Sequence, residues 1–136
     1  MKKTLFIITV IFFSVMLILT VFAEDIHNFS LPRVTVSRPE QRYFPYEYTD
    51  ENGNAQTGSV QKTAIPKALS EQGVYVIYSA EKNGTVRSFV RLADVVTGEE
   101  KDGYVEVISG VDFFDSIVSG CSEVLSDGCE VLIENR

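Results

Sequence analysis

Four Asn-Gly or Asp-Gly dipeptides divide the part of the chain that follows its N-terminal apolar run. They are Asn52-Gly53, Asn83-Gly84, Asp102-Gly103 and Asp127-Gly128. Such dipeptides supply the positive φ angles that tight hairpin turns require. The segments between them are rich in Val, Ile, Tyr and Phe, which favour strands. The spacing of these turns therefore predicts a mainly β chain built from hairpins.

The clearest hairpin is expected around Asn83-Gly84, with strands over residues 74–82 and 85–92. The second strand alternates between an apolar face and a basic face, as a half-buried strand does. Its apolar positions are Val86, Val90 and Leu92, and its basic positions are Arg87 and Arg91. Another hairpin is expected around Asp102-Gly103, from Val95-Val96 to residues 104–108.

Short helical turns and edge strands complete the expected fold. Residues 67–72 and 122–126 are the two helical candidates after the apolar run. Residues 33–37 alternate between two prolines and are expected to form an edge strand. The fold class that follows is mainly β: a small antiparallel β-barrel or rolled sheet with one or two short helical turns, preceded by an N-terminal apolar leader helix.

Four aromatic residues gather within residues 43–48. They are Tyr43, Phe44, Tyr46 and Tyr48, with Pro45 among them. One interpretation is a strand that packs its rings on a sheet, with Pro45 confining it to an edge. The other is an aromatic platform that stacks against a ligand or partner. The first interpretation is favoured, and the tyrosines stay candidate contacts.

The N-terminal segment has the pattern of a bacterial export signal. Lys2 and Lys3 precede an uncharged apolar run that ends at Val21-Phe22-Ala23, an acceptable cleavage site. The run is also long enough to span a bilayer as an uncleaved anchor. Residues 1–23 are thus a signal peptide or an N-terminal membrane anchor. Both interpretations place the remainder outside the cytoplasm, at the outer face of the cytoplasmic membrane or secreted.

The remainder of the chain is acidic. Of the 12 basic residues, 10 follow the leader, as do all 19 acidic residues, which gives a net charge of −9. This charge argues against nucleic acid and anionic membrane surfaces as partners. We divide this part into a polar, loop-like lead-in over residues 24–63, with candidate edge strands, and a β domain over residues 64–136.

The sequence contains no catalytic constellation. His27, the sole histidine of the sequence, lies in the lead-in, whereas a catalytic pair requires a base held against its nucleophile. Zinc sites take three or four Cys, His or carboxylate ligands, and the chain offers two Cys and one distant His. We therefore expect a protein that is not an enzyme and has no cofactor or metal.

The two cysteines allow two interpretations. Cys121 and Cys129 are separated by seven residues, which is not the Cys-x-x-Cys spacing of redox motifs. Export would allow them to form a structural disulfide, and Gly120 and Asp127-Gly128 would let the chain turn back. The alternative is two buried thiols.

An ordered series of short motifs runs from residue 65 to residue 131. The motifs are Ile65-Pro66-Lys67-Ala68-Leu69, Val74-Tyr75-Val76-Ile77, Thr85-Val86-Arg87, residues 102–111 (DGYVEVISGV), residues 115–120 (DSIVSG) and residues 124–131 (VLSDGCEV). This series resembles the C-terminal, membrane-proximal part of periplasmic adaptor subunits, the membrane fusion proteins of RND-type and HlyD-like efflux and secretion systems. Phe114 and Ala93 stand where that family commonly has glycine.

The resemblance implies an exported, non-enzymatic accessory protein that docks on a membrane transporter of the ABC or RND type, or on a full-length adaptor. The family's α-helical hairpin and lipoyl-like domain have no counterpart in this sequence. The candidate contacts are Arg87, Arg91, Tyr43, Tyr46 and Tyr48. The alternatives are a secreted β-domain binding module for envelope polymer or a small ligand, and a truncated adaptor remnant.

Overall fold

The N-terminal apolar run forms a helix, α1 (Lys2–Val21), in a computed structural model that describes residues 1–134 except the side chain of Glu24. The segment contains neither glycine nor proline, so every interior backbone N–H can bond within the helix. A second helix, α2 (Ala23–Phe29), follows where the sequence predicted a loop. The loop prediction was wrong. Residues 23–31 contain neither glycine nor proline, and the first proline, Pro32, comes after Ser30, the residue that caps the C-terminus of α2.

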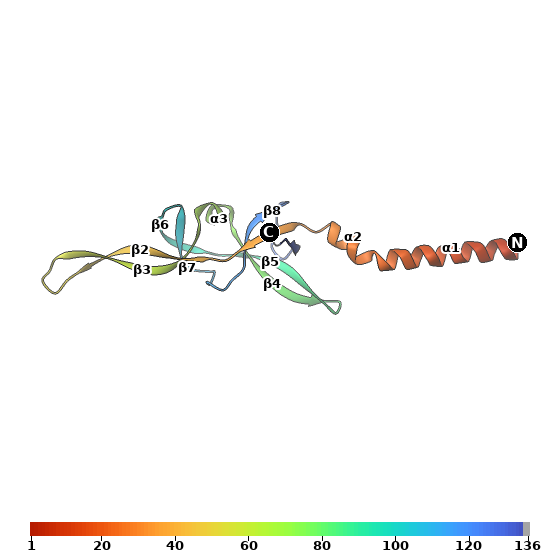
Figure 1. The fold of residues 1–136 in the computed structure, drawn as a ribbon, viewed down its shortest axis with the longest axis horizontal. Coiled ribbons are helices and arrows are strands. Elements are labelled where there is room, and N and C mark those ends of the chain that lie inside the picture. The colour runs from red at the N-terminus through yellow and green to blue at the C-terminus, as the bar shows by residue number, and fades with distance from the viewer. Residues whose placement is uncertain (135–136) are drawn as a thin grey trace. The chain divides into compact units, whose positions relative to one another are not determined.

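The chain divides into two compact units, Met1–Leu31 and the part that begins at Pro32. Over its described residues, 32–134, the second unit contains nine strands and one short helix (Figure 1). They are β1 (Arg33–Ser37), β2 (Glu40–Thr49), β3 (Ala55–Pro66), α3 (Lys67–Gln72), β4 (Val74–Lys82), β5 (Thr85–Ala93), β6 (Val96–Lys101), β7 (Tyr104–Ser109), β8 (Ile117–Cys121) and β9 (Glu130–Ile133).

The strands form two curled sheets. One is a closed barrel with the order β1-β8-β4-β5-β9, and the other is a four-stranded sheet with the order β2-β3-β7-β6. Their pairings are antiparallel apart from β1 with β9, which is parallel. The predicted fold class, mainly β with an N-terminal apolar helix, is confirmed.

Two hairpin turns lie where the sequence predicted them. Asn83 and Gly84 have φ angles of 55° and 78°, and Asp102 and Gly103 have φ angles of 53° and 78°. Two successive positive φ angles match the twist of antiparallel strands, which is why these dipeptides are favoured there. The predicted helical turn over residues 67–72 is also confirmed as α3, which ends at Gly73.

The core consists of two clusters of buried side chains. The first contains Ile65, Val74, Val76, Val105, Val111 and Ile117. The second contains Val34, Val90, Val118, Leu125 and Val131. Ile117 and Val118 are successive residues of β8 and face opposite sides, so β8 contributes to both clusters.

Strand β1 is not the edge strand that the sequence predicted. It pairs with β8 on one side and with β9 on the other, and Val34 at its centre is fully buried. An alternating pattern reports that one face is buried but not how many neighbours a strand has. The expected start of the β domain at residue 64 likewise falls inside β3, which is continuous from Ala55 to Pro66.

Residues 122–126 do not form the predicted helical turn. The backbone N–H of Ser122 donates to the carbonyl of Arg33, and the N–H of Arg33 donates to Oγ of Ser122. These bonds extend the pairing between β1 and β8 past Cys121 and hold Ser122 beside β1. Leu125 is buried against the barrel while Val124 is exposed, so one residue of this segment is fixed by packing.

The apolar face predicted for β5 is only partly buried. Val90 is 0% exposed, but Val86 is 72% exposed and Leu92 is also exposed. Val86 is exposed because β5 pairs with β9 through Ser88 and Phe89, while the β4–β5 hairpin extends away from the barrel beyond them toward its turn (Figure 1).

Candidate interaction surface on the β2–β3 hairpin

The β2–β3 hairpin is a long ribbon that leaves the sheet near Ala64. Its ten register pairs run from Glu40 opposite Ala64 to Thr49 opposite Ala55. Residues 64–66 of β3 pair with β7, and within residues 1–134 the remainder of β3 pairs with β2 (Figure 1). A two-stranded ribbon is marginally stable by itself. Contacts of its side chains with the rest of the unit therefore decide how firmly it is held.

The base of the hairpin is held by β6 and β7. Phe44 is buried there, and Nζ of Lys62 lies 5.8 Å from the centre of its ring. Lys62 also forms an ion pair with Glu106 at 3.0 Å. Nζ of Lys101, at the end of β6, donates a hydrogen bond of 2.9 Å to the carbonyl of Tyr43. The last bond joins β6 and β2, so the two outer strands of this sheet approach each other.

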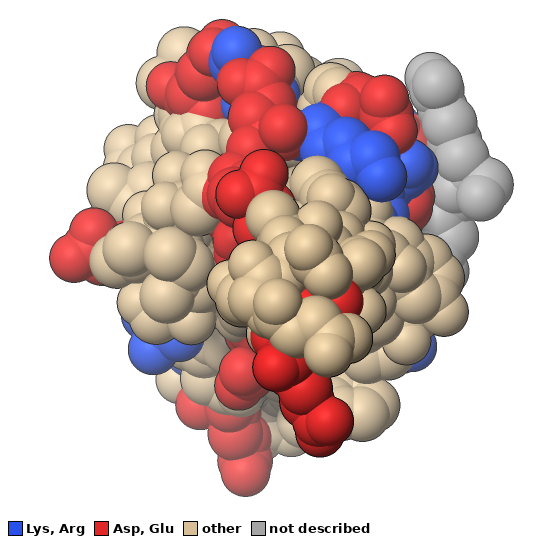
Figure 2. Space-filling model, turned by 90° about the vertical axis from the view of Figure 1, so that its left-hand side faces the viewer, with Lys and Arg blue, Asp and Glu red and all other residues tan. Residues whose placement is uncertain are grey.

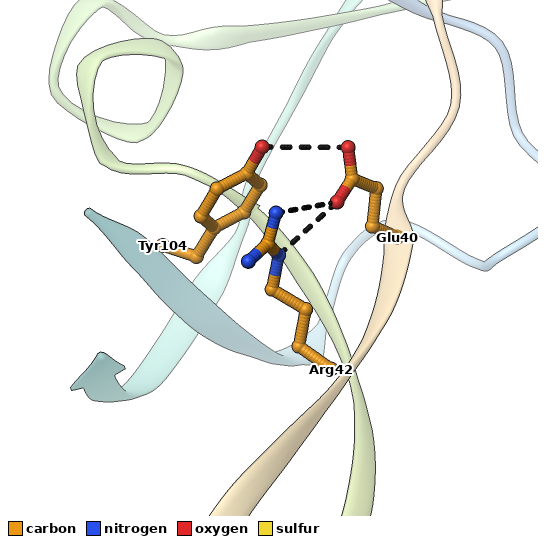
Figure 3. A network of polar contacts seen from close by, with 3 residues as sticks. All are labelled: Glu40, Arg42 and Tyr104. Carbon is orange, nitrogen blue, oxygen red and sulfur yellow. Dashed lines mark hydrogen bonds and ion pairs between the residues drawn. The ribbon is translucent and has the colours of Figure 1, made fainter. Parts of the chain in front are cut away.

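Glu40, Arg42 and Tyr104 form a polar network at the same base (Figure 3). Nη2 and Nε of Arg42 donate to Oε2 of Glu40 at 2.8 and 3.1 Å, and the hydroxyl of Tyr104 contacts Oε1 at 3.3 Å. Cζ of Arg42 lies 3.4 Å from the centre of the Tyr104 ring. Desolvation opposes the charge of Arg42, but the hydrogen bond to Glu40 and its other partners outweigh it and raise its pKa.

Beyond this base, one face of the hairpin presents aromatic rings. Phe44, Tyr46 and Tyr48 lie on the same face because they alternate along β2, and Val60 is opposite Phe44. Tyr46 and Tyr48 are 46% and 47% exposed, and their ring centres are 5.6 Å apart. Tyr43 lies on the other face and is 60% exposed. Phe44 is thus buried, as packing of the rings on a sheet would require, whereas the three tyrosines stay exposed.

Gly58 leaves room for the ring of Tyr46 to lie against β3. The two residues are opposite each other, and a Cβ at position 58 would lie 2.6 Å from Cε1 of Tyr46. Sequence reasoning missed this residue. The available signal was a glycine inside a strand, which often marks a close approach of another group to the backbone.

The loop at the far end of the hairpin is ordered by Asp50. Its Oδ1 accepts hydrogen bonds from the backbone N–H groups of Asn54 and Asn52 at 2.8 and 2.9 Å. These bonds stabilise the carboxylate and lower the pKa of Asp50, and the bond from Asn54 has the largest effect. Asn52-Gly53 therefore differs from Asn83-Gly84 and Asp102-Gly103, because it lies in a five-residue loop where Gly53 has a positive φ and Asn52 does not.

The hairpin carries an uneven charge. Between Arg42 and Lys62 the sequence contains Glu47, Asp50 and Glu51 and no basic residue. In Figure 2 the loop end of the hairpin faces the viewer, and Asp and Glu cover more of this side than Lys and Arg. An open, polar hollow of about 310 Å³ lies beside the base, lined by Glu40, Gln41, Arg42, Tyr43, Phe44, Lys101 and Asp102.

The other predicted contact residues lie on the barrel. Arg87 is half-buried and forms an ion pair with Glu130 at 2.6 Å, so its charge is used inside the unit. Arg91 is exposed on the same face of β5. Among the described residues, no contact joins the two arginines to the three tyrosines. Arg87 has a structural role through its ion pair with Glu130.

Cysteine and metal chemistry do not define a site. Cys121 and Cys129 are free thiols, the first exposed and the second half-buried against the barrel cluster, so the disulfide left open by the sequence is not formed. His27 lies in α2. Within residues 1–134, no group of three or more His, Cys, Asp or Glu side chains is placed so that it could hold a metal ion.

Helix α1 has the length and composition of a membrane span. Its mean hydropathy is 2.7 and all of its residues are exposed. The chain thus combines an apolar N-terminal helix with a β unit that presents exposed tyrosines. No family model, curated protein or solved structure matches it.

Proposed function

We propose that this chain is an extracytoplasmic β domain, exported or held by its N-terminal helix, that acts by docking on a membrane protein and not by catalysis. The observation that carries the proposal is the join between α1 and β1. An exposed apolar helix is followed, after residues 22–32, by β1, which pairs with β8 and β9 in the barrel.

The physical argument starts from the helix. Twenty exposed residues of this hydropathy are unfavourable in water and favourable in a bilayer, where a helix satisfies its own backbone groups. Lys2 and Lys3 favour a cytoplasmic N-terminus, which places the β unit on the other side. Residues 22–32 span at most about 40 Å when fully extended, so an uncleaved helix would keep β1 near the membrane.

The partner proposed is a transporter of the ABC or RND type, or a full-length adaptor. The support is the ordered resemblance over residues 65–131 to the membrane-proximal part of adaptor subunits. Those residues form α3 and six strands, β4 to β9, of the β unit. They include four of the five barrel strands, and β1 completes the barrel.

Crosslinking of the tagged full-length chain in its native membranes, followed by affinity purification and mass spectrometry, tests this function. We expect a transporter permease or a full-length adaptor to be recovered with the chain from the membrane fraction. An untagged strain and a sample without crosslinker are the controls. Recovery of the chain in the medium or wall fraction, without a transporter or adaptor, would contradict the proposal.

A second function, binding of envelope polymer or a small ligand, is favoured by the paired rings of Tyr46 and Tyr48. Exposed aromatic rings can stack against the flat faces of ligands. Isolated wall polymer should then retain the full-length chain and release the Tyr46→Ala/Tyr48→Ala variant. Equal retention of the two proteins would remove this candidate.

A further inference from the structure

We infer that the face of the β2–β3 hairpin formed by Tyr46, Tyr48 and Val60, here called the tyrosine face, binds a segment of the partner protein that is rich in Lys and Arg. The inference rests on the proposed docking function and specifies the chemistry of the partner. It concerns a surface separate from Arg87 and from the barrel.

The tyrosine face lies on the same side of the hairpin as the buried side chain of Phe44. Phe44, at the base of the same face, is buried, with Nζ of Lys62 over its ring, and Val60 is directly opposite it. Farther along, Tyr46 and Tyr48 leave about half of their side-chain surface exposed. Aromatic surface of this kind contributes strongly to protein interfaces because each ring buries a large apolar area.

The tyrosine face is ordered before any partner arrives. Gly58 allows the ring of Tyr46 to lie against β3, and the ring of Tyr48 lies 5.6 Å from it. The hydrogen bonds of Asp50 order the loop next to these rings. Tyrosine has few rotatable bonds, and a prearranged surface loses less entropy on binding.

The surrounding charge selects a basic partner. Asp50 and Glu51 lie in the loop next to Tyr48, and Glu47 lies between the two tyrosines in sequence but on the opposite face of β2. Residues 43–61 contain no Lys or Arg. Cations are attracted both by carboxylates and by the faces of aromatic rings. The chain uses this combination itself, because Arg42 pairs with Glu40 while its guanidinium lies over Tyr104.

The same charge disfavours a second copy of the chain as the occupant. The net charge of the chain is −7, and two tyrosine faces brought together would also bring their acidic loops together. A segment bearing Lys and Arg meets the rings and the carboxylates at once. It would also be guided to the surface by the negative field of the hairpin.

The test places a photoreactive amino acid in the full-length chain in native membranes. Position 56 is suitable because Gln56 is exposed opposite Tyr48, so every tyrosine is retained. Position 86, exposed on the β4–β5 hairpin, is the matched control. We expect position 56 to crosslink a membrane protein through a peptide in which Lys and Arg outnumber Asp and Glu, as mapped by mass spectrometry.

Three variants of the chain test the chemistry at position 56. Tyr46→Ala/Tyr48→Ala and Glu47→Gln/Glu51→Gln should each reduce the crosslink several-fold, and high salt should do the same. Tyr43→Ala, on the other face, should leave it unchanged. Gly58→Ala retains both rings but displaces that of Tyr46, so it should reduce the crosslink while circular dichroism shows an intact fold.

The outcomes separate this inference from the proposed function. A crosslink to a neutral or acidic peptide, to envelope polymer or to a second copy would overturn the inference. A membrane protein crosslinked at position 86 and not at position 56 would also overturn it while leaving the docking function in place. If neither position crosslinks a membrane protein, the inference fails, and the affinity purification of the tagged chain decides the docking function separately.

Discussion

At the residue scale, the ionisation of Asp50 makes the hydrogen bonding of the hairpin loop depend on pH. Hydrogen bonds from Asn54 and Asn52 favour the ionised form, so the pKa of Asp50 lies below its ordinary value. The stabilisation is therefore complete above the unfolded pKa, about 3.9, and is lost as the pH falls through the lower folded value. The backbone amides of Asn52 and Asn54 should lose their hydrogen bonds over the same acidic range.

An NMR titration of the full-length chain in detergent measures this effect. The carboxyl carbon of Asp50 and the amides of Asn52 and Asn54 should titrate together, below the range of an ordinary Asp. Asp50→Asn, which has no titrating group, should leave the two amides insensitive to acid. Amides that titrate unchanged in this variant would show that another group is responsible.

At the element scale, the contact between β5 and β9 closes the barrel. In the register of these two strands, Ser88 lies opposite Val131 and Phe89 lies opposite Glu130. The side chain of Glu130 is only 9% exposed and pairs with Arg87 at 2.6 Å and Lys82 at 3.5 Å. Glu130→Gln retains the size of the side chain but removes its charge. It should lower the free energy of unfolding by about 1–3 kcal/mol, because hydrogen bonds to charged groups contribute that much.

Thermal or urea unfolding of the full-length chain in detergent gives the measurement. Glu134→Gln is the matched control, because Glu134 pairs with Arg33 at 3.3 Å and both side chains are 51% exposed. Exposed pairs contribute about 0–1 kcal/mol, so this variant should remain close to the unmodified chain. Equal losses in the two variants would contradict a special role for Glu130.

At the scale of the whole molecule, the apolar helix α1 should determine where the β unit resides. Arginine near the centre of a membrane helix costs about 2.5–3.5 kcal/mol on insertion scales. Ile11→Arg/Phe12→Arg, in the middle of α1, should therefore retain the β unit in the cytoplasm. Protease added to spheroplasts should cleave the unmodified chain and spare this variant.

Thr4→Lys is the control for that experiment, because it adds a positive charge at the cytoplasmic end of α1 and should leave export unchanged. Protease cleavage of the double arginine variant would show that α1 does not direct the β unit across the membrane.

The candidate surface was only partly predictable from the sequence. The aromatic composition of residues 43–48 marked Tyr43, Tyr46 and Tyr48 as candidate contacts. It did not show that Phe44 would be buried while its tyrosine neighbours stayed exposed. Exposure depends on strands that lie far away in the sequence, and Gly58 became informative once its register with Tyr46 was known.

The sequence by itself determined the features that depend on local backbone chemistry. The turns at Asn83-Gly84 and Asp102-Gly103, the short helix α3 and the apolar helix α1 follow from residues that are adjacent in the chain.

Only the tertiary structure decided which strands are neighbours and which faces are covered. Strand β1 lies between β8 and β9, and residues 122–126 form no helix, with Ser122 bonded to Arg33 of β1. These outcomes depend on contacts between residues about a hundred positions apart, such as Arg33 with Leu132. Local patterns do not specify such pairings, because an alternating strand can have the same sequence whether it pairs with one neighbouring strand or with two.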